Sequence, residues 1–233
     1  MKNSWPERHY IDLFAGAGHA RIDDTDEIVQ TSAILAATVR DPFTKLHLCE
    51  RDPTNAAALK IRLGRLDPSP TSLVTMADAN EAIHKVLENV PAGALSVAFA
   101  DPFGLHLDFE TVRAIAHRRC DLIILLADNM DALRNWAAYY DKNPNSNLDR
   151  FMGEGGWRDT LANSPTNQRA ERLRARYFER LKSLRYSHID SVSVQNDHGN
   201  DIYSLVYASR SSVGLKFWRE ARAVSEDGQR FLF

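Results

Sequence analysis

The first half of the chain repeats one pattern, in which a short apolar run is followed by a stretch with helical spacing. The apolar runs predict strands and the stretches between them predict helices. The predicted strands cover 9–14, 45–50, 72–76, 94–100 and 121–126, and the predicted helices cover 31–40, 54–66, 80–87 and 109–117. Parallel strands need crossover connections, which these helices supply. The sequence therefore predicts an α/β fold whose parallel sheet carries helices on both faces.

The pattern changes after the fifth predicted strand. Residues 128–185 contain no clear strand and include an arginine-rich helical stretch at 168–184. Two strand-like runs, 188–195 and 202–209, then flank the turn residues Asn196-Asp197-His198-Gly199-Asn200, which indicates a hairpin before a last helix at 213–224. Five parallel strands followed by an antiparallel hairpin are the order expected of a Rossmann-like class I methyltransferase sheet. We expect one domain, 1–233, with a helical insertion at 128–185 that contacts substrate or a partner.

Composition excludes some classes of protein. The 233 residues are 44% hydrophobic and 26% charged, as in ordinary globular domains, and the net charge of −2 gives no overall basicity that would indicate a nucleic-acid partner. Cys49 and Cys120 lack metal-ligand spacing, and the eight histidines are scattered, so we expect no metal. No apolar run has the length of a membrane span, and residues 1–8 lack a signal core. The expected location is the cytoplasm, away from membranes.

A glycine turn follows the first predicted strand in Asp12-Leu13-Phe14-Ala15-Gly16-Ala17-Gly18. Glycine lets the backbone approach a ligand closely, and ligands of such sheets bind at the carboxyl ends of the strands. Arg21 stands where the phosphate-binding G-x-G-x-x-G motif has its third glycine. S-adenosylmethionine (SAM) has no phosphate and tolerates the shorter motif, and Asp12 would face its ammonium group. The alternative is an unspecific turn. Predicted cofactor contacts here are Asp12, Phe14, Ala15, Gly16 and Gly18.

Two further acids end the next predicted strands. Glu50, followed by Arg51, is placed to accept both ribose hydroxyls of a nucleoside, and the alternative is a solvated acid. Asp78, followed by Ala79, is placed to bind an adenine amino group, and the alternative is a cap for the helix that follows. Acids at the ends of three successive strands are more specific than any one alone. We therefore add Glu50, Arg51, Asp78 and Ala79 to the predicted cofactor site.

The fourth strand runs into Asp101-Pro102-Phe103-Gly104. This segment resembles the [D/N]-P-P-[Y/F] element of amino-methyltransferases, in which the acid and a proline carbonyl hold the target amine while an aromatic ring stacks on it. Such contacts orient the attacking lone pair, which is catalysis by positioning. The second proline is missing, so an amine and a hydroxyl acceptor both stay open. Asp101, Pro102 and Phe103 are the predicted catalytic residues, against the alternative of a turn acid and a core phenylalanine.

The region 128–185 allows two interpretations. The basic stretch 169–182 would either grip phosphates or form a helix with one buried and one solvated face. Trp136, Tyr139, Tyr140 and Trp157 would line a substrate or form a small core of their own.

Tyr10–Gly18 together with Asp101–Gly104 resembles the three-Cys-motif partner (TcmP) family. The likeness extends to a long loop at 19–30, which we expect to close over the cofactor, and to the final strand and helix at 202–218. It differs at Gln30-Thr31-Ser32, where the family has Gly-Ser-Pro, and at Ala17, where it has proline. The resemblance implies a Rossmann-like SAM-binding protein associated with a radical-SAM-type partner that bears a three-cysteine motif.

The function predicted from these features is SAM-dependent methyl transfer to an amine or hydroxyl, in a nucleic acid or a peptide. The alternative is a non-catalytic adapter of the same fold that docks a partner protein or nucleic acid through 128–185. Nicotinamide-dependent oxidoreduction is disfavoured by Arg21.

Overall fold

The computed structural model describes residues 5–196 and 198–223. Contacts within the chain define two compact units, Met1–Cys120 and Asp121–Phe233. Within these described ranges, no helix combines the length and the apolar character needed to cross a membrane.

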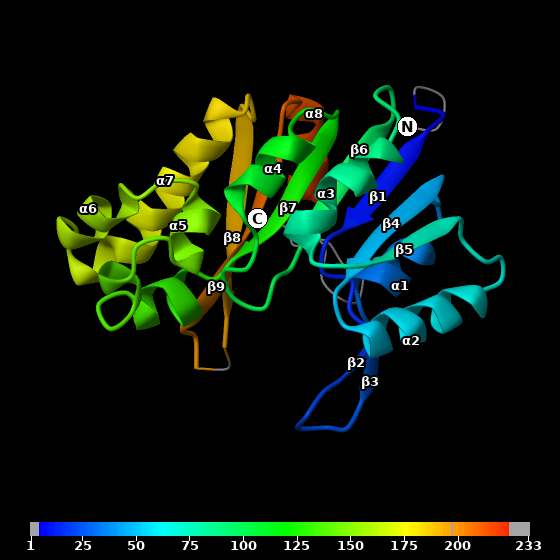
Figure 1. Cartoon of the computed structure of the whole chain (residues 1–233), viewed down its shortest axis with the longest axis horizontal. Helices are drawn as coiled ribbons and strands as arrows, with labels where there is room; N and C mark the ends of the chain where they lie inside the picture. Colours follow the sequence, from blue (N-terminus) through cyan, green and yellow to red (C-terminus); the bar gives the residue numbers. More distant parts are fainter. Residues whose placement is uncertain (1–4, 197, 224–233) are drawn as a thin grey trace. The chain divides into compact units, whose positions relative to one another are not determined.

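The first unit is built on four parallel strands in the order β5-β4-β1-β6 (Figure 1). The strands are β1 (Arg8–Asp12), β4 (Lys45–Glu50), β5 (Ser72–Met76) and β6 (Leu95–Ala100). The connecting helices are α1 (Ser32–Ala37), α2 (Pro53–Gly64), α3 (Ala79–Glu88) and α4 (Phe109–Ile115). Every predicted strand and helix of this half is present, with ends shifted by a few residues.

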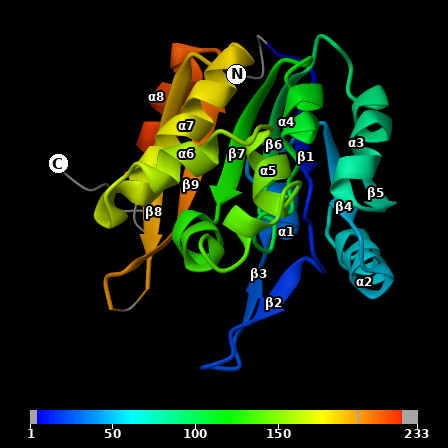
Figure 2. The same ribbon diagram turned by 60° about the vertical axis from the view of Figure 1, so that its left-hand side comes forward.

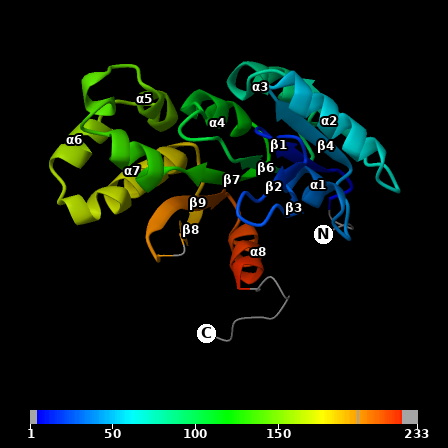
Figure 3. The same cartoon turned by 90° about the horizontal axis from the view of Figure 1, so that it is seen from below.

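Helices cover the strands of this sheet on both sides, and α4 lies on the side opposite α1 (Figure 3). Tyr10, Leu46 and Leu48 form one core with Ile34 of α1 and Leu59 of α2. Burial along β1 and β4 is continuous rather than alternating, as expected of strands covered on both faces, and it includes the polar residues His9, Asp12 and His47.

Residues 19–30, which the sequence predicts as a long loop, form a β-hairpin, and its closure over the cofactor stays a prediction. Strands β2 (His19–Arg21) and β3 (Ile28–Gln30) pair antiparallel, with His19 opposite Gln30. Asp26 adopts a positive φ of 57° in the turn, and its N–H donates to Ile22 O. The hairpin extends beyond the carboxyl ends of the strands (Figure 2). The sequence pattern did not indicate these strands, because the β-formers Ile28 and Val29 are a short run next to an acidic turn.

The second unit contains an antiparallel sheet in the order β7-β9-β8, made by β7 (Cys120–Leu126), β8 (His188–Gln195) and β9 (Asp201–Ser209). The predicted C-terminal hairpin is therefore confirmed, although Asp197 of its turn lies outside the described residues. The last helix is α8 (Ser212–Arg222), and Val224, the predicted end, also lies outside them. The predicted fold class, a Rossmann-like α/β sheet with a C-terminal antiparallel hairpin, is confirmed.

Only helices are described between β7 and β8 within 127–187. They are η1 (Asp128–Leu133), η2 (Tyr140–Lys142), α5 (Asn147–Met152), α6 (Trp157–Ala162), η3 (Thr166–Gln168) and α7 (Arg169–Ser183). Trp157 and Tyr140 are buried among them, whereas Tyr139 is exposed. The interpretation of these two aromatic residues as a small core is confirmed.

The arginines of α7 bind within their own unit. Arg176 forms an ion pair with Glu154, Arg180 donates to the carbonyl of Met152, and Arg174 lies 3.7 Å from the buried carboxylate of Asp128. The buried face of the helix carries Tyr177, whose ring stacks on Phe151, and Arg174 and Arg180 flank this residue one turn away. These three arginines thus pair or hydrogen-bond with groups of their own unit. Their guanidinium groups do not form a free phosphate-binding face.

Candidate cofactor site

Four acidic residues stand at the carboxyl ends of the four parallel strands. Asp12 ends β1, Glu50 ends β4, Asp78 follows β5 and Asp101 follows β6. Because neighbouring parallel strands end at the same edge of a sheet, the first unit brings all four to that edge. The grouping predicted from sequence for the first three acids is therefore present, and Asp101 joins it.

The two glycines of the turn have different reasons to be glycine. Gly16 has a φ of 61° and Gly18 a φ of 84°, both in the left-handed region that favours glycine. A Cβ built at Gly16 would meet no atom within 4 Å, whereas one at Gly18 would lie 2.9 Å from Ile34 Cγ1. Gly18 therefore lets the turn pack against α1, and Gly16 leaves open space above the backbone where a ligand fits.

The turn is joined to the strands on either side. Ala15 N–H donates to Cys49 O at the end of β4, and Leu13 N–H donates to Phe99 O in β6. The half-buried Phe14 lies between these contacts. Hydrogen bonds to both neighbouring strands give the turn one defined position at the sheet edge.

Glu50 connects this turn to α2. Its Oε2 accepts from Gly16 N at 2.8 Å and its Oε1 accepts from Asp52 N at 2.7 Å. Each carboxylate oxygen has two lone pairs, so each retains capacity for a second donor. A half-buried carboxylate with two free acceptor positions beside open space suits a pair of vicinal hydroxyls.

Asp12 lies inside the turn rather than on its surface. Its side chain is 0% exposed and accepts from Ser32 Oγ at 2.6 Å, from Tyr10 Oη at 3.2 Å and from Phe14 N at 3.2 Å. Burial raises the pKa of this carboxyl to about 6, the three hydrogen bonds oppose the rise, and the charge of Asp101 adds to it. Asp12 thus ties β1, the turn and α1 together.

Asp78 is the N-cap of α3, so the helix-cap interpretation is confirmed. Its side chain accepts from Asn80 N at 2.9 Å, and its Oδ2 lies 3.9 Å from Nη1 of Arg51. The Arg51 side chain is 81% exposed, while Ala79 is buried as the first residue of α3. A contact of Asp78 with an adenine amino group stays a prediction.

Phe103 projects into solvent, so the interpretation of this residue as part of the core is wrong. Its side chain is 91% exposed, between the buried Pro102 and the half-buried Gly104, which has a positive φ of 85°. Asp101 is exposed beside it, and partial desolvation raises the pKa of its carboxyl. An exposed aromatic ring next to a carboxylate forms a surface on which a flat acceptor can stack.

Asn80 was missed by the sequence analysis. Its Nδ2 donates to His106 O at 2.8 Å, and its Oδ1 accepts from Asp108 N at 2.9 Å and from Thr111 Oγ1 at 2.8 Å. One amide thereby holds the segment that follows Asp101–Gly104 against the start of α3. No local pattern marks this role, because the partners lie 26 to 31 residues away.

The electrostatic character of this edge favours a cationic ligand. Four carboxylates gather there, and Arg51 is the basic side chain paired with one of them. Such a field attracts cations and repels phosphates. In the ranges 5–196 and 198–223, no group of three or more histidine, cysteine or acidic side chains is arranged to hold a metal ion.

No protein-family model matches the chain, and no curated protein matches it in sequence. Solved structures do match its fold. A Legionella pneumophila protein of the DUF519 family superposes with a TM-score of 0.56 at 10% identity, over 93% of this chain and 83% of that one. The O-methyltransferase TomG from Streptomyces achromogenes, solved with SAM, gives 0.52 at 13% identity, over 87% of this chain and 73% of that one.

An O-methyltransferase from Bacillus cereus, solved with S-adenosylhomocysteine (SAH), gives a TM-score of 0.50 at 12% identity, over 87% of this chain and 74% of that one. The chain therefore has the fold of the Rossmann-like methyltransferases.

Proposed function

We propose that this protein is a SAM-dependent methyltransferase whose cofactor binds at the carboxyl ends of β1 and β4. One observation carries the proposal: Glu50 accepts from the N–H of Gly16 beside open space and keeps two acceptor positions free. The same fold in two methyltransferases solved with SAM or SAH supports it.

The residues at this edge would divide the binding of SAM among them. Glu50 would accept the two ribose hydroxyls, and the acids around it would favour the cationic sulfonium and ammonium groups. The Phe14–Gly18 backbone would pack against the ligand. Asp12 would act from beneath, holding the turn in place through Ser32 and Phe14. Arg51, Asp78 and Ala79 would border the adenine.

Bound SAM supplies an electrophilic methyl group on a sulfonium. Phe103 would stack on the acceptor, and Asp101 with the carbonyl of Pro102 would orient its nitrogen or oxygen lone pair toward that methyl group. The raised pKa of Asp101 makes its carboxylate a stronger base. It would take up the proton that the nitrogen or oxygen of the methyl acceptor releases. The pH dependence of the rate would follow the ionisation of this carboxyl.

The acceptor class is a finer proposal. The two methyltransferases with the same fold are O-methyltransferases, which favours a hydroxyl, and the amino-methyltransferase-like Asp101–Gly104 segment favours an amine. A nucleic acid or a peptide would carry either group. The resemblance to the three-Cys-motif partner family adds the hypothesis of a radical-SAM-type partner protein.

The proposal is tested by calorimetry with SAM and SAH on the full chain. We expect both to bind, and Glu50→Ala to weaken binding at least tenfold, which corresponds to about 1.4 kcal/mol. Glu88→Ala is the matched control, because this exposed acid ends α3 and we expect its loss to leave affinity within twofold. If neither cofactor form binds the wild-type protein, the proposal fails.

A further inference from the structure

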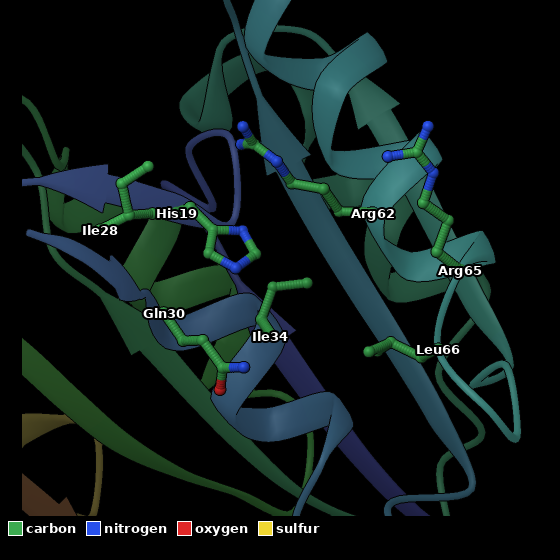
Figure 4. A pocket seen from close by; sticks show the side chains of 7 residues that line it. All are labelled: His19, Ile28, Gln30, Ile34, Arg62, Arg65 and Leu66. Carbon is green, nitrogen blue, oxygen red and sulfur yellow. The ribbon is translucent and has the colours of Figure 1, made fainter.

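A pocket of about 400 Å³ opens in the first unit, among the base of the β2–β3 hairpin, α1 and the C-terminal part of α2 (Figure 4). Arg62 of α2 and Arg65, which follows this helix, line it together with His19 and Gln30 of the hairpin. None of these four residues belongs to the proposed cofactor site. The pocket is within the usual size range of small-molecule sites, which starts at about 300 Å³.

The polar lining of this pocket is basic and lacks a counter-charge. Among the described residues, no acidic side chain forms an ion pair with Arg62 or Arg65. His19 is largely covered, and its Nδ1 is buried with no hydrogen-bond partner within the described part of the chain. Since buried polar groups are normally hydrogen-bonded, each such group calls for an explanation. Because Nδ1 is closed to solvent, a ligand acceptor in the pocket would provide one only if the imidazole ring turned toward it.

The other side of the pocket is apolar. Ile34 and Leu66 line it, and so does Ile28, which is 68% exposed on the hairpin. An exposed isoleucine beside guanidinium groups that lack an acidic partner among the described residues suits a ligand with an apolar body and an anionic head. The planar guanidinium binds phosphate oxygens in pairs, and two of them balance a phosphate monoester that carries nearly two charges at pH 7.

We propose that this pocket binds a small organic phosphate monoester. The phosphate pairs with Arg62 and Arg65 and accepts from His19, and the apolar body lies against Ile28 and Leu66. This site is chemically opposite to the acid-rich edge that we assign to SAM. The two sites therefore select ligands of opposite charge within one unit.

The pocket is joined to the cofactor turn by two contacts. Arg62 donates through Nη1 to the carbonyl of Ala17, and Ile34, which lines the pocket, packs against Gly18. A phosphate that draws Arg62 toward itself weakens the hold on Ala17. Occupation of the pocket then changes the affinity for SAM, and SAM changes the affinity of the pocket by the same factor. Only this coupling rests on the proposed function.

The experiment titrates the full chain with phenyl phosphate, followed by NMR chemical shifts, without any cofactor. We expect saturable shifts at residues around the pocket. Arg65→Gln, which touches no part of the cofactor turn, should weaken binding at least tenfold, as should Arg62→Gln. Lys60→Gln is the matched control, because it removes the same charge from an exposed position of α2 outside the pocket, and its affinity should stay within twofold.

Further arms separate the parts of the proposal. Ile28→Ser should weaken phenyl phosphate at least threefold and leave the weaker binding of inorganic phosphate unchanged. The proposal is overturned if the wild-type protein shows no saturable shifts, or if Lys60→Gln weakens binding as much as Arg65→Gln. It is also overturned if a short oligonucleotide displaces phenyl phosphate at lower concentration than a second phosphate monoester does.

Calorimetry with SAM at saturating phenyl phosphate then measures the coupling. Loss of SAM binding in every sample, with phenyl phosphate still bound, would refute the methyltransferase proposal alone.

Discussion

Burial shifts the pKa values of several single groups in the first unit. His9 Nδ1 and His47 Nε2 lie 2.9 Å apart in stacked rings, and both side chains are buried. Burial lowers the pKa of both, that of His47 to about 4, with Glu7 raising and Lys45 lowering the pKa of His9. Asp12 acts in the opposite sense, because burial raises its pKa to about 6.

We expect the free energy of unfolding to fall on acidification through the histidine pair. The pKa of His47 is about 4 in the folded state and its ordinary value is 6.5, so the unfolded state binds more protons between these values. The contribution is full above pH 6.5 and is lost as the pH falls toward 4. Urea unfolding at pH 7.5 and 5.0 measures the loss, and His47→Gln should reduce it. An unchanged difference between the two pH values in the variant would contradict this assignment.

The comparison of variant with wild type is necessary because of Asp12. Its raised pKa means that the folded state binds more protons than the unfolded state between the ordinary value of 3.8 and about 6, so its ionisation costs stability as the pH rises through that range. The two effects partly cancel in the wild-type curve. The contribution of His47 to the pH dependence of the free energy of unfolding is therefore separated from that of Asp12 only when one of the two groups is removed.

At the scale of elements, the chain positions its candidate site by joining strand ends to helix starts. Asp52 and Asp78 cap α2 and α3, and Glu50 fastens the glycine turn to the segment between β4 and α2. These joints were predictable in part, because an acid before a helical pattern is a known cap signal. Asn80 was not predictable, since its three bonds reach a segment distant in the sequence.

Asn80→Ala should destabilise the first unit by about 1–3 kcal/mol, because it leaves polar groups of the following loop without partners. Asn89→Ala is the control. Asn89 sits at the other end of α3 and donates to Lys85 O from an exposed position, so its loss should cost less than about 0.5 kcal/mol. Urea unfolding of the three proteins makes the comparison, and equal costs for both variants would refute a special role of Asn80.

At the scale of the whole molecule, the open choice lies between an enzyme and an adapter of the same fold. The exposed Phe103 beside Asp101 serves either, as an acceptor platform or as a docking point. The arginine-rich α7 no longer favours the adapter, because Arg174, Arg176 and Arg180 bind within their own unit. The acids at the strand ends favour the enzyme.

Asp101→Ala should reduce methyl transfer at least a hundredfold and change the affinity for SAM less than threefold, as expected for a group that orients the acceptor. Transfer of labelled methyl to RNA, DNA and protein fractions gives the measurement and the acceptor class together. Asp108→Ala, in the same connection but at the N-cap position of α4, is the control. Full activity in Asp101→Ala would favour the adapter.

The sequence alone determined the α/β alternation, the C-terminal hairpin and the glycine turn, because apolar periodicity and turn residues act locally. It also identified the strand-end acids, since consecutive parallel strands end at one edge. Tertiary structure decided what those residues face: Asp12 is buried under three donors, Phe103 is exposed, and 19–30 pairs as a hairpin. Burial and hydrogen bonding depend on residues far apart in the chain, which no local pattern encodes.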